Sequence, residues 1–117
     1  MAYEPEFGEW VREHFGALGP LEIKRMFGAA GVYSNGLIFA ILGEGEVWLK
    51  ADDQTIPALA AAGSRAFAVT GKDGEMTTSY WSLPASATDD PEEAVRWARG
   101  AIDAAMRRQA GKKARRR

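Results

Sequence analysis

An uninterrupted apolar segment, Leu37–Leu42, constrains the fold of this chain more than any other feature. So short a run cannot span a membrane. It suits a β-strand, and its lack of polar alternation is typical of a central strand that is covered on both faces. Asn35-Gly36 comes just before it, and Gly43-Glu44-Gly45-Glu46 follows it. Because Asn-Gly supplies the positive φ angles of a two-residue hairpin turn, we expect this strand to lie in an antiparallel sheet.

The rest of the chain surrounds this strand with helices and further β segments. We expect the α+β class in the order α-β3-α-β2-α, an antiparallel sheet packed by helices. Gly19-Pro20 predicts the end of the first helix, and Asp89 or Asp90 as a cap, with Pro91 at the first helical position, predicts the start of the last. The expected elements are a helix over 5–18, three β segments over 23–34, 37–42 and 47–50, a short helix over 53–63 with Thr55 as its cap, a hairpin over 66–83, and a last helix from 91.

The net charge of −1 conceals an uneven distribution. The chain has 15 basic and 16 acidic residues, and seven of the basic ones lie after Met106, where no acid occurs. The rest of the chain therefore carries about −8 and this end about +7, so that phosphate backbones are attracted to the end and repelled by the rest. We predict a domain over 1–106 and a basic, flexible tail over 107–117. The basic residues of the tail are Arg107, Arg108, Lys112, Lys113, Arg115, Arg116 and Arg117.

Residue types that are missing exclude several classes of protein. The chain contains no cysteine, which excludes disulfides, thiolate metal sites and cysteine nucleophiles. Its N-terminus is acidic and has no apolar run, so we expect no signal peptide. Since no apolar stretch is long enough to span a bilayer, we expect a cytoplasmic protein without a membrane partner.

Few residues are candidates for catalysis or for metal binding. The single histidine, His14, falls on or beside the apolar face of the first helix, where packing is the favoured interpretation. Asp52-Asp53 and Asp89-Asp90 fit helix caps better than a carboxylate-only magnesium or calcium site. Gly28-Ala29-Ala30-Gly31 lacks the Gly-Lys-Ser/Thr ending of a phosphate-binding loop, and we interpret it as a bulge or bend. We therefore expect no catalytic residues, cofactor or metal.

Trp48 and Tyr80 stand out among the aromatic residues because they alternate with apolar neighbours in β segments. We expect both side chains to face outward on one face of the sheet. Such a pair predicts a partner surface, with a homodimer as the natural inference. Stacking of single-stranded bases is the alternative, which the acidic charge of residues 1–106 disfavours.

Two segments carry a family resemblance: Lys24-Arg25-Met26-Phe27-Gly28-Ala29-Ala30-Gly31-Val32-Tyr33, and Tyr80-Trp81-Ser82-Leu83-Pro84. With Asn35-Gly36 and Val47-Trp48-Leu49-Lys50 between them, they resemble the N-terminal domain of the TfoX/Sxy family. The resemblance extends over about Pro5 to Met106. Ala29 departs from the pattern, because the family commonly has a second glycine there.

The resemblance implies a secretion-chaperone-like α+β arrangement. It also implies a regulatory association, since full-length relatives are linked to activating genes of natural competence for DNA uptake. Those regulators carry a C-terminal domain after this one, and we expect this chain to be a stand-alone N-terminal domain. The family offers no established catalytic residues.

Residues and resemblance together predict a non-catalytic protein-interaction module linked to transcriptional or competence regulation. The alternative is weak, sequence-independent nucleic-acid binding through the basic tail. A simpler interpretation of that tail is that it solvates a helix end and complements the helix dipole. An enzyme would need a cleft that holds Lys24, Lys50 and a carboxylate.

Overall fold

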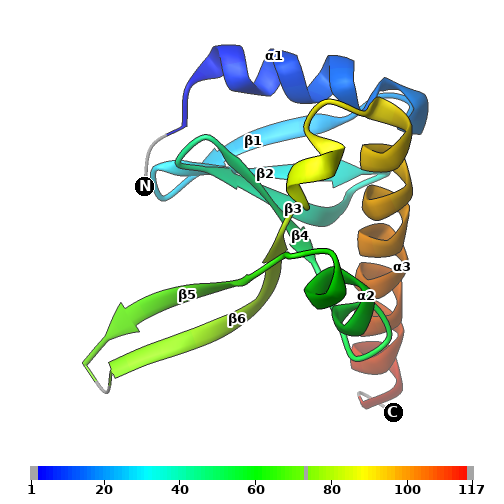
Figure 1. Cartoon of the computed structure of the whole chain (residues 1–117). Helices are drawn as coiled ribbons and strands as arrows, with labels where there is room; N and C mark the ends of the chain where they lie inside the picture. Colours follow the sequence, from blue (N-terminus) through cyan, green and yellow to red (C-terminus); the bar gives the residue numbers. More distant parts are fainter. Residues whose placement is uncertain (1–2, 73, 116–117) are drawn as a thin grey trace.

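A computed structural model describes residues 3–72 and 74–115, apart from the side chains of residues 70, 71 and 113–115. Helices and an antiparallel sheet make up the fold, which confirms the predicted α+β class (Figure 1). The helices are α1 (Pro5–His14), α2 (Ile56–Ala61) and α3 (Pro91–Arg115), with short 3₁₀ helices η1 (Gly16–Leu18) and η2 (Ala85–Ala87). The strands are β1 (Glu22–Met26), β2 (Ala29–Ser34), β3 (Leu37–Gly43), β4 (Glu46–Lys50), β5 (Ala66–Gly71) and β6 (Gly74–Ser82).

The predicted order α-β3-α-β2-α is wrong by one strand, because four strands lie between α1 and α2. The expected single segment over 23–34 is a hairpin, in which β1 and β2 pair in antiparallel register. Phe27 (φ 49°) and Gly28 (φ 80°) both adopt the left-handed conformation, which reverses the chain between the two strands. Ala29, Ala30 and Gly31 therefore belong to β2 and not to a bend.

The apolar strand is central, as expected. The sheet has the order β1-β2-β3-β4-β6-β5, so β3 has neighbours on both sides. Asn35 (φ 51°) and Gly36 (φ 79°) make the predicted hairpin turn before it. The register aligns Val32 with Ala40 and Ala40 with Leu49, so these three side chains lie on the same face of the sheet.

That face carries the core of the protein. Val32, Ala40 and Leu49 are buried in one cluster with residues of α1 and α3, which Figure 1 shows above and beside the sheet. The α-helix residues in this cluster are Val11 of α1, Leu59 of α2, and Ala94, Ala98 and Ala101 of α3, and Phe15 follows α1 directly. The expectation that β3 is covered on both faces is wrong for the other face, where Ile38 and Ile41 are only half-buried. The helices form one layer, on one side of the sheet.

The last helix begins as predicted and continues past the expected boundary. The Asp90 carboxylate accepts hydrogen bonds from the backbone N–H groups of Glu92 (3.1 Å) and Glu93 (3.2 Å), which confirms it as the cap. The helix then runs through Met106 as far as Arg115. The basic residues 107–115 thus extend the helix that packs on the sheet. No helix in the described part of the chain is long and apolar enough to cross a membrane.

The other two helices are shorter than predicted. The first ends at His14 and gives way to η1, and α2 starts only at Ile56. Thr55 occupies the N-cap position of α2, but its hydroxyl makes no capping bond. The hydroxyl instead accepts from the backbone N–H of Asp52 at 3.0 Å. These contacts form a turn that leads from β4 into α2.

The hairpin of β5 and β6 projects from the body of the protein (Figure 1). Only Tyr80, Trp81 and Ser82 of β6 pair with β4, so the rest of this strand pairs with β5 alone. Val69 and Met76 are direct partners across the hairpin, and they are 43% and 60% exposed. The hairpin thus presents apolar side chains away from the core.

Candidate functional site

The sheet face opposite the core cluster carries a second set of large side chains. Register and alternation place on it Met26, Tyr33, Ile38, Ile41, Trp48 and Tyr80, and we call this surface the open face. Among the described residues, the core cluster includes none of these six. The open face therefore has large side chains that lie outside the core cluster.

Gly31 lies in the open face and allows three of these side chains to meet. A Cβ atom at this position would lie 2.9 Å from Ile38 Cδ1, 2.9 Å from Met26 Cε and 3.1 Å from Tyr33 Cε1. These distances are shorter than ordinary van der Waals contacts, so a side chain here would push its neighbours apart. The glycine thus lets Met26, Tyr33 and Ile38 close over the strand as one half-buried patch.

Trp48 lies on the open face, but the expectation that it is exposed is wrong. Its side chain is 4% exposed, because the start of the β5–β6 hairpin covers it. The Phe67 ring packs at 4.8 Å between ring centroids, and the Arg65 guanidinium lies 5.1 Å from the indole. The buried Nε1–H has no hydrogen-bond acceptor among the described residues.

Tyr80 shares this face with Trp48, as predicted, and is half-buried. It pairs across β4 and β6 with Lys50, whose ammonium lies 4.7 Å from the centre of the phenol ring. Burial raises the pKa of the Tyr80 phenol above its ordinary value. Tyr80 is the more exposed of the two predicted partner residues, and Lys50 lies beside it.

The first basic residue after Met106 has a structural contact. Arg107 forms a bidentate ion pair with Asp52, through Nε to Oδ2 at 2.7 Å and Nη2 to Oδ1 at 2.9 Å. The hydrogen bonds from Arg107 lower the pKa of Asp52 below its ordinary value, against the smaller, opposing effect of burial. Asp52 thus fixes α3 to the turn before α2, in addition to accepting from the Gln54 backbone N–H at 3.0 Å.

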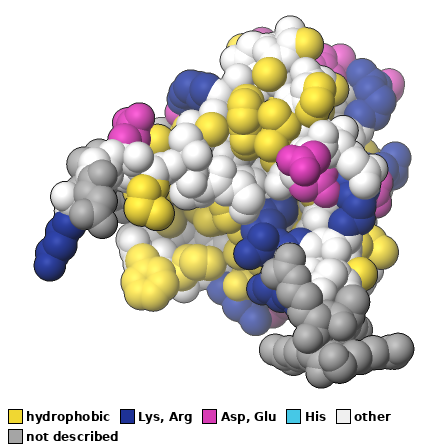
Figure 2. Space-filling view, turned by 90° about the horizontal axis from the view of Figure 1, so that it is seen from below, with side chains coloured by type: hydrophobic (Ala, Val, Ile, Leu, Met, Phe, Trp, Pro, Cys, Tyr) yellow, Lys and Arg dark blue, Asp and Glu magenta, His cyan; other side chains and the backbone are white. Residues whose placement is uncertain are grey.

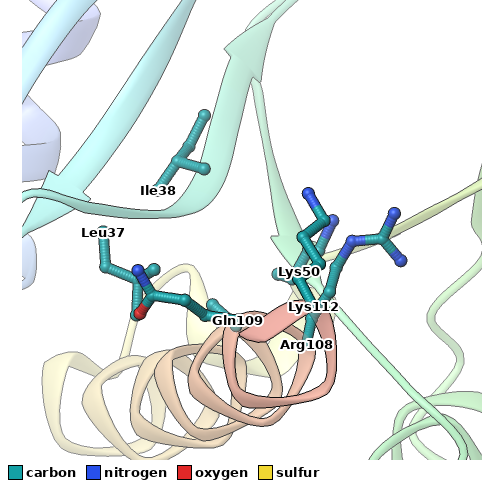
Figure 3. Close-up of a pocket in the computed structure, with 7 residues that line it drawn as sticks. Leu37, Ile38, Lys50, Arg108, Gln109 and Lys112 are labelled. Atoms are coloured by element: carbon teal, nitrogen blue, oxygen red, sulfur yellow. The ribbon is translucent and has the colours of Figure 1, made fainter. Parts of the chain in front are cut away.

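Two further basic residues of α3 line a pocket. Arg108 and Lys112 lie one helical turn apart and meet Lys50 at the end of β4, around a cavity of about 320 Å³ (Figure 3). Leu37 and Ile38 form the opposite wall. We call this cavity the basic pocket; Ala105 and Gln109 complete its lining. Seen from below, several Lys and Arg side chains lie close together in the lower right part of the view (Figure 2).

The basic pocket has a positive charge that its own surroundings do not neutralise. Among the described residues, Lys50, Arg108 and Lys112 form no ion pair. The Lys50 ammonium donates a hydrogen bond to Ser79 Oγ at 2.9 Å. Burial, and then repulsion by Arg108 and Lys112, lower the pKa of Lys50 below its ordinary value. Such a site stabilises an anion that enters it.

The remaining candidate residues lie apart from this pocket. Lys24 pairs with Glu22 at 3.7 Å and lies over the Tyr33 ring, so the structure does not bring it together with Lys50 in a cleft. The side chains of Lys113 and Arg115, and all of Arg116 and Arg117, fall outside the described residues. Sequence reasoning named Lys50 and the basic residues of the tail separately. The alternation along β4 and the helical repeat from 105 to 112 indicate which face each of these residues occupies, but not that the two faces meet.

His14 is a packing residue, as predicted. Its Nε2–H donates a hydrogen bond to the carbonyl oxygen of Ala87 at 2.8 Å, and its ring stacks on Trp10 at 4.4 Å. Since a carbonyl oxygen can only accept, Nε2 carries the proton. Groups of three or more side chains suited to bind a metal do not occur within the described residues.

A known family of domains matches most of the chain. The curated protein sequences gave no match to the chain. A family model described as the TfoX N-terminal domain matches residues 13–105, which is well over half of the 117 residues. The matched range begins near the end of α1 and includes every strand and most of α3. The chain therefore belongs to the TfoX N-terminal domain family.

Proposed function

We propose that this chain is a non-catalytic protein-interaction module with a regulatory role, and that it binds its partner through the open face. The observation that carries the proposal is the half-buried patch of Met26, Tyr33 and Ile38, which lies outside the core cluster. A sheet face with apolar side chains is normally covered by another layer or by a partner. Membership of a family of regulatory type supports the same role.

The surroundings of the patch resemble the rim of an interface. Lys24, Lys50 and Arg65 lie at or beside the aromatic residues of this face, which gives the apolar centre a polar border. Phe27, at the turn between β1 and β2, has a fully exposed side chain and a positive φ angle. An exposed aromatic residue in a strained conformation is typical of a functional contact.

The first partner to test is a second copy of the chain. Two sheet faces of this kind can bury each other around a two-fold axis, because the same patch then serves both subunits. A cytoplasmic setting belongs to the same proposal, and the absence of cysteine is compatible with it.

Sedimentation velocity over a wide range of protein concentration tests the dimer. Ile38→Asp places a charge in the open face and should abolish association, whereas Val69→Asp places the same charge on the projecting hairpin and should leave it unchanged. Circular dichroism of both variants checks that they fold. A protein that is monomeric at every concentration would contradict self-association, and loss of the dimer in Val69→Asp alone would move the interface to the hairpin.

A second candidate function is sequence-independent nucleic-acid binding through the basic end of α3. Arg108 and Lys112 support it, because they form no ion pair among the described residues, whereas Arg107 is already paired with Asp52. With Arg107 engaged, we expect a slope of log affinity against log salt no steeper than about −5. Fluorescence anisotropy with a labelled oligonucleotide at several salt concentrations measures this slope. Affinity that does not change with salt would exclude this function.

A further inference from the structure

The basic pocket combines two kinds of surface in a small volume. On one side lie Leu37 and Ile38 of β3, and on the other Lys50, Arg108 and Lys112 (Figure 3). Its volume of about 320 Å³ falls at the lower end of the range for small-molecule sites. A ligand that fills it must therefore be small, apolar at one end and negatively charged at the other.

The three cations converge for reasons built into the fold. Lys50 points to the open face because it alternates with Leu49, which is in the core. Arg108 and Lys112 follow Ala104 and Ala105, which are buried where α3 packs on the sheet. The hydrogen bond to Ser79 and the contact with Tyr80 hold the Lys50 side chain in place. Lys50 is thus held in position before any ligand enters, which lowers the entropic cost of binding.

We infer that the basic pocket binds a small organic phosphate monoester, with its phosphate held by Lys50, Arg108 and Lys112 and its apolar part against Leu37 and Ile38. Three cations favour a phosphate over a carboxylate, since a phosphate monoester carries close to two negative charges at neutral pH and offers three acceptor oxygens. Binding would also relieve the mutual repulsion of the three cations. This inference does not depend on the proposed role of the open face in protein binding, although the pocket shares Ile38 with that face and Lys50 with its border.

A polynucleotide is a poorer occupant of the same site. A second hollow of about 400 Å³ adjoins the basic pocket, shares its three cations, and is lined in addition by Asp52, Asp53 and Arg107. Arg107 neutralises Asp52, but the Asp53 carboxylate forms no ion pair among the described residues. It would repel the further phosphates of a continuous backbone, whereas a single phosphate can stay at the three cations. A small phosphate monoester and a nucleic-acid backbone both present phosphate groups, so the experiment must distinguish between them.

The test is a ¹H–¹⁵N NMR titration of the full chain with phenyl phosphate, with inorganic phosphate, and with a short single-stranded oligonucleotide that lacks a terminal phosphate. Phenyl phosphate should produce saturable shifts centred on Lys50, Ser79, Arg108 and Lys112, and it should bind more tightly than inorganic phosphate. Arg108→Gln and Lys112→Gln should each weaken it about tenfold, because each removes a charge-assisted hydrogen bond. Arg99→Gln removes the same charge from an exposed position on the opposite side of α3 and should have no effect.

Several results would overturn the inference. If phenyl phosphate gives no saturable shift in the wild type, the site is excluded. If Arg99→Gln weakens phenyl phosphate binding as much as Arg108→Gln does, the binding is only nonspecific electrostatic attraction. If inorganic phosphate binds as tightly as phenyl phosphate, the apolar part of the ligand makes no contribution to binding. An oligonucleotide that binds more tightly than phenyl phosphate, and is weakened by Arg108→Gln, would identify the source of the phosphate as a nucleic-acid backbone. Sedimentation of Arg108→Gln should match the wild type, which separates this result from the test of the open face.

Discussion

The two faces of the sheet carry apolar side chains from the same strands but have different surroundings. On the core face, Ala40 and Leu49 are almost completely buried beneath α3. On the open face, Ile38 and Ile41 come from the same strand as Ala40, and they remain half-buried. Alternation along a strand supplies apolar residues to both faces, but the helix layer covers one face only. The difference separates the residues that stabilise the fold from those that are available to a partner.

Small residues of α3 explain why the core face is so well covered. Ala94, Ala98, Ala101 and Ala104 are buried on one side of the helix. Because alanine has a short side chain, the helix backbone approaches the sheet closely and the larger side chains of the strands fill the space between them. The open face has no comparable layer, so we expect substitutions there to alter binding more than stability.

The largest expected effect is on the core face. Leu49 is 1% exposed, and Leu49→Ala should lower the free energy of unfolding by about 3 kcal/mol through lost burial and the cavity left behind. Ile41→Ala, on the open face of the neighbouring strand, should cost only about 1 kcal/mol because its side chain is half-buried. Urea denaturation of both variants measures the difference. Equal losses would contradict the division between the two faces.

A smaller effect is expected where the open face is covered by β5. Trp48→Phe removes a buried Nε1–H that has no acceptor among the described residues. The free energy gained in this way should offset part of the free energy lost because the side chain is smaller. The free energy of unfolding should therefore change by less than about 1 kcal/mol. The same urea denaturation measures it, and a loss above about 2 kcal/mol would show that the indole N–H is satisfied in solution.

The ion pair between Asp52 and Arg107 should make a small, pH-dependent contribution. The pKa of Asp52 is lowered in the folded protein, so its carboxylate stabilises the fold above the unfolded pKa, and this contribution is lost as the pH falls through the folded pKa. Asp52→Asn should lower the melting temperature by about 2 °C at pH 7, since both partners are partly solvated. The difference from the wild type should shrink below about pH 4. If the difference in melting temperature grows in acid, the Asp52 carboxylate does not stabilise the fold through this ion pair.

The smallest effect is expected on the projecting hairpin. Met76→Thr replaces a side chain that is 60% exposed and lies outside the core cluster. The free energy of unfolding should change by no more than about 0.5 kcal/mol. A larger loss in thermal or urea denaturation would mean that the hairpin packs against the body in solution, which would extend the core to this region.

Local signals in the sequence predicted the features that depend on neighbouring residues. Asn35-Gly36 predicted a hairpin turn, and the turn has the expected positive φ angles. Asp90 and Pro91 predicted the start of α3. The turn at Phe27 was missed because phenylalanine is rarely found at positive φ, so its sequence gives no turn signal. The strand count failed for this reason.

Features that depend on distant residues could not be predicted. Trp48 is buried by Phe67 and Arg65, which return to it only after α2 and the turn into β5. The ion pair of Asp52 and Arg107 joins residues 55 positions apart, and the basic pocket unites β3, β4 and α3 in the same way. Helical and strand periodicities indicate which face of an element a residue occupies, but not which other element meets that face. The residue types of the basic pocket could therefore be recognised in the sequence, but the fact that the fold brings them together could not.

The most direct test of the two-face account is the attenuation of side-chain methyl signals by a soluble paramagnetic probe, measured by NMR. In dilute protein, the methyl groups of Ile38 and Ile41 should be strongly attenuated, while those of Leu42 and Leu49 are protected in the core. At high protein concentration, Ile38 and Ile41 should become protected as a second copy covers the open face. Equal attenuation of all four residues in dilute protein, or protection that appears only at Val69 on the hairpin, would contradict the account.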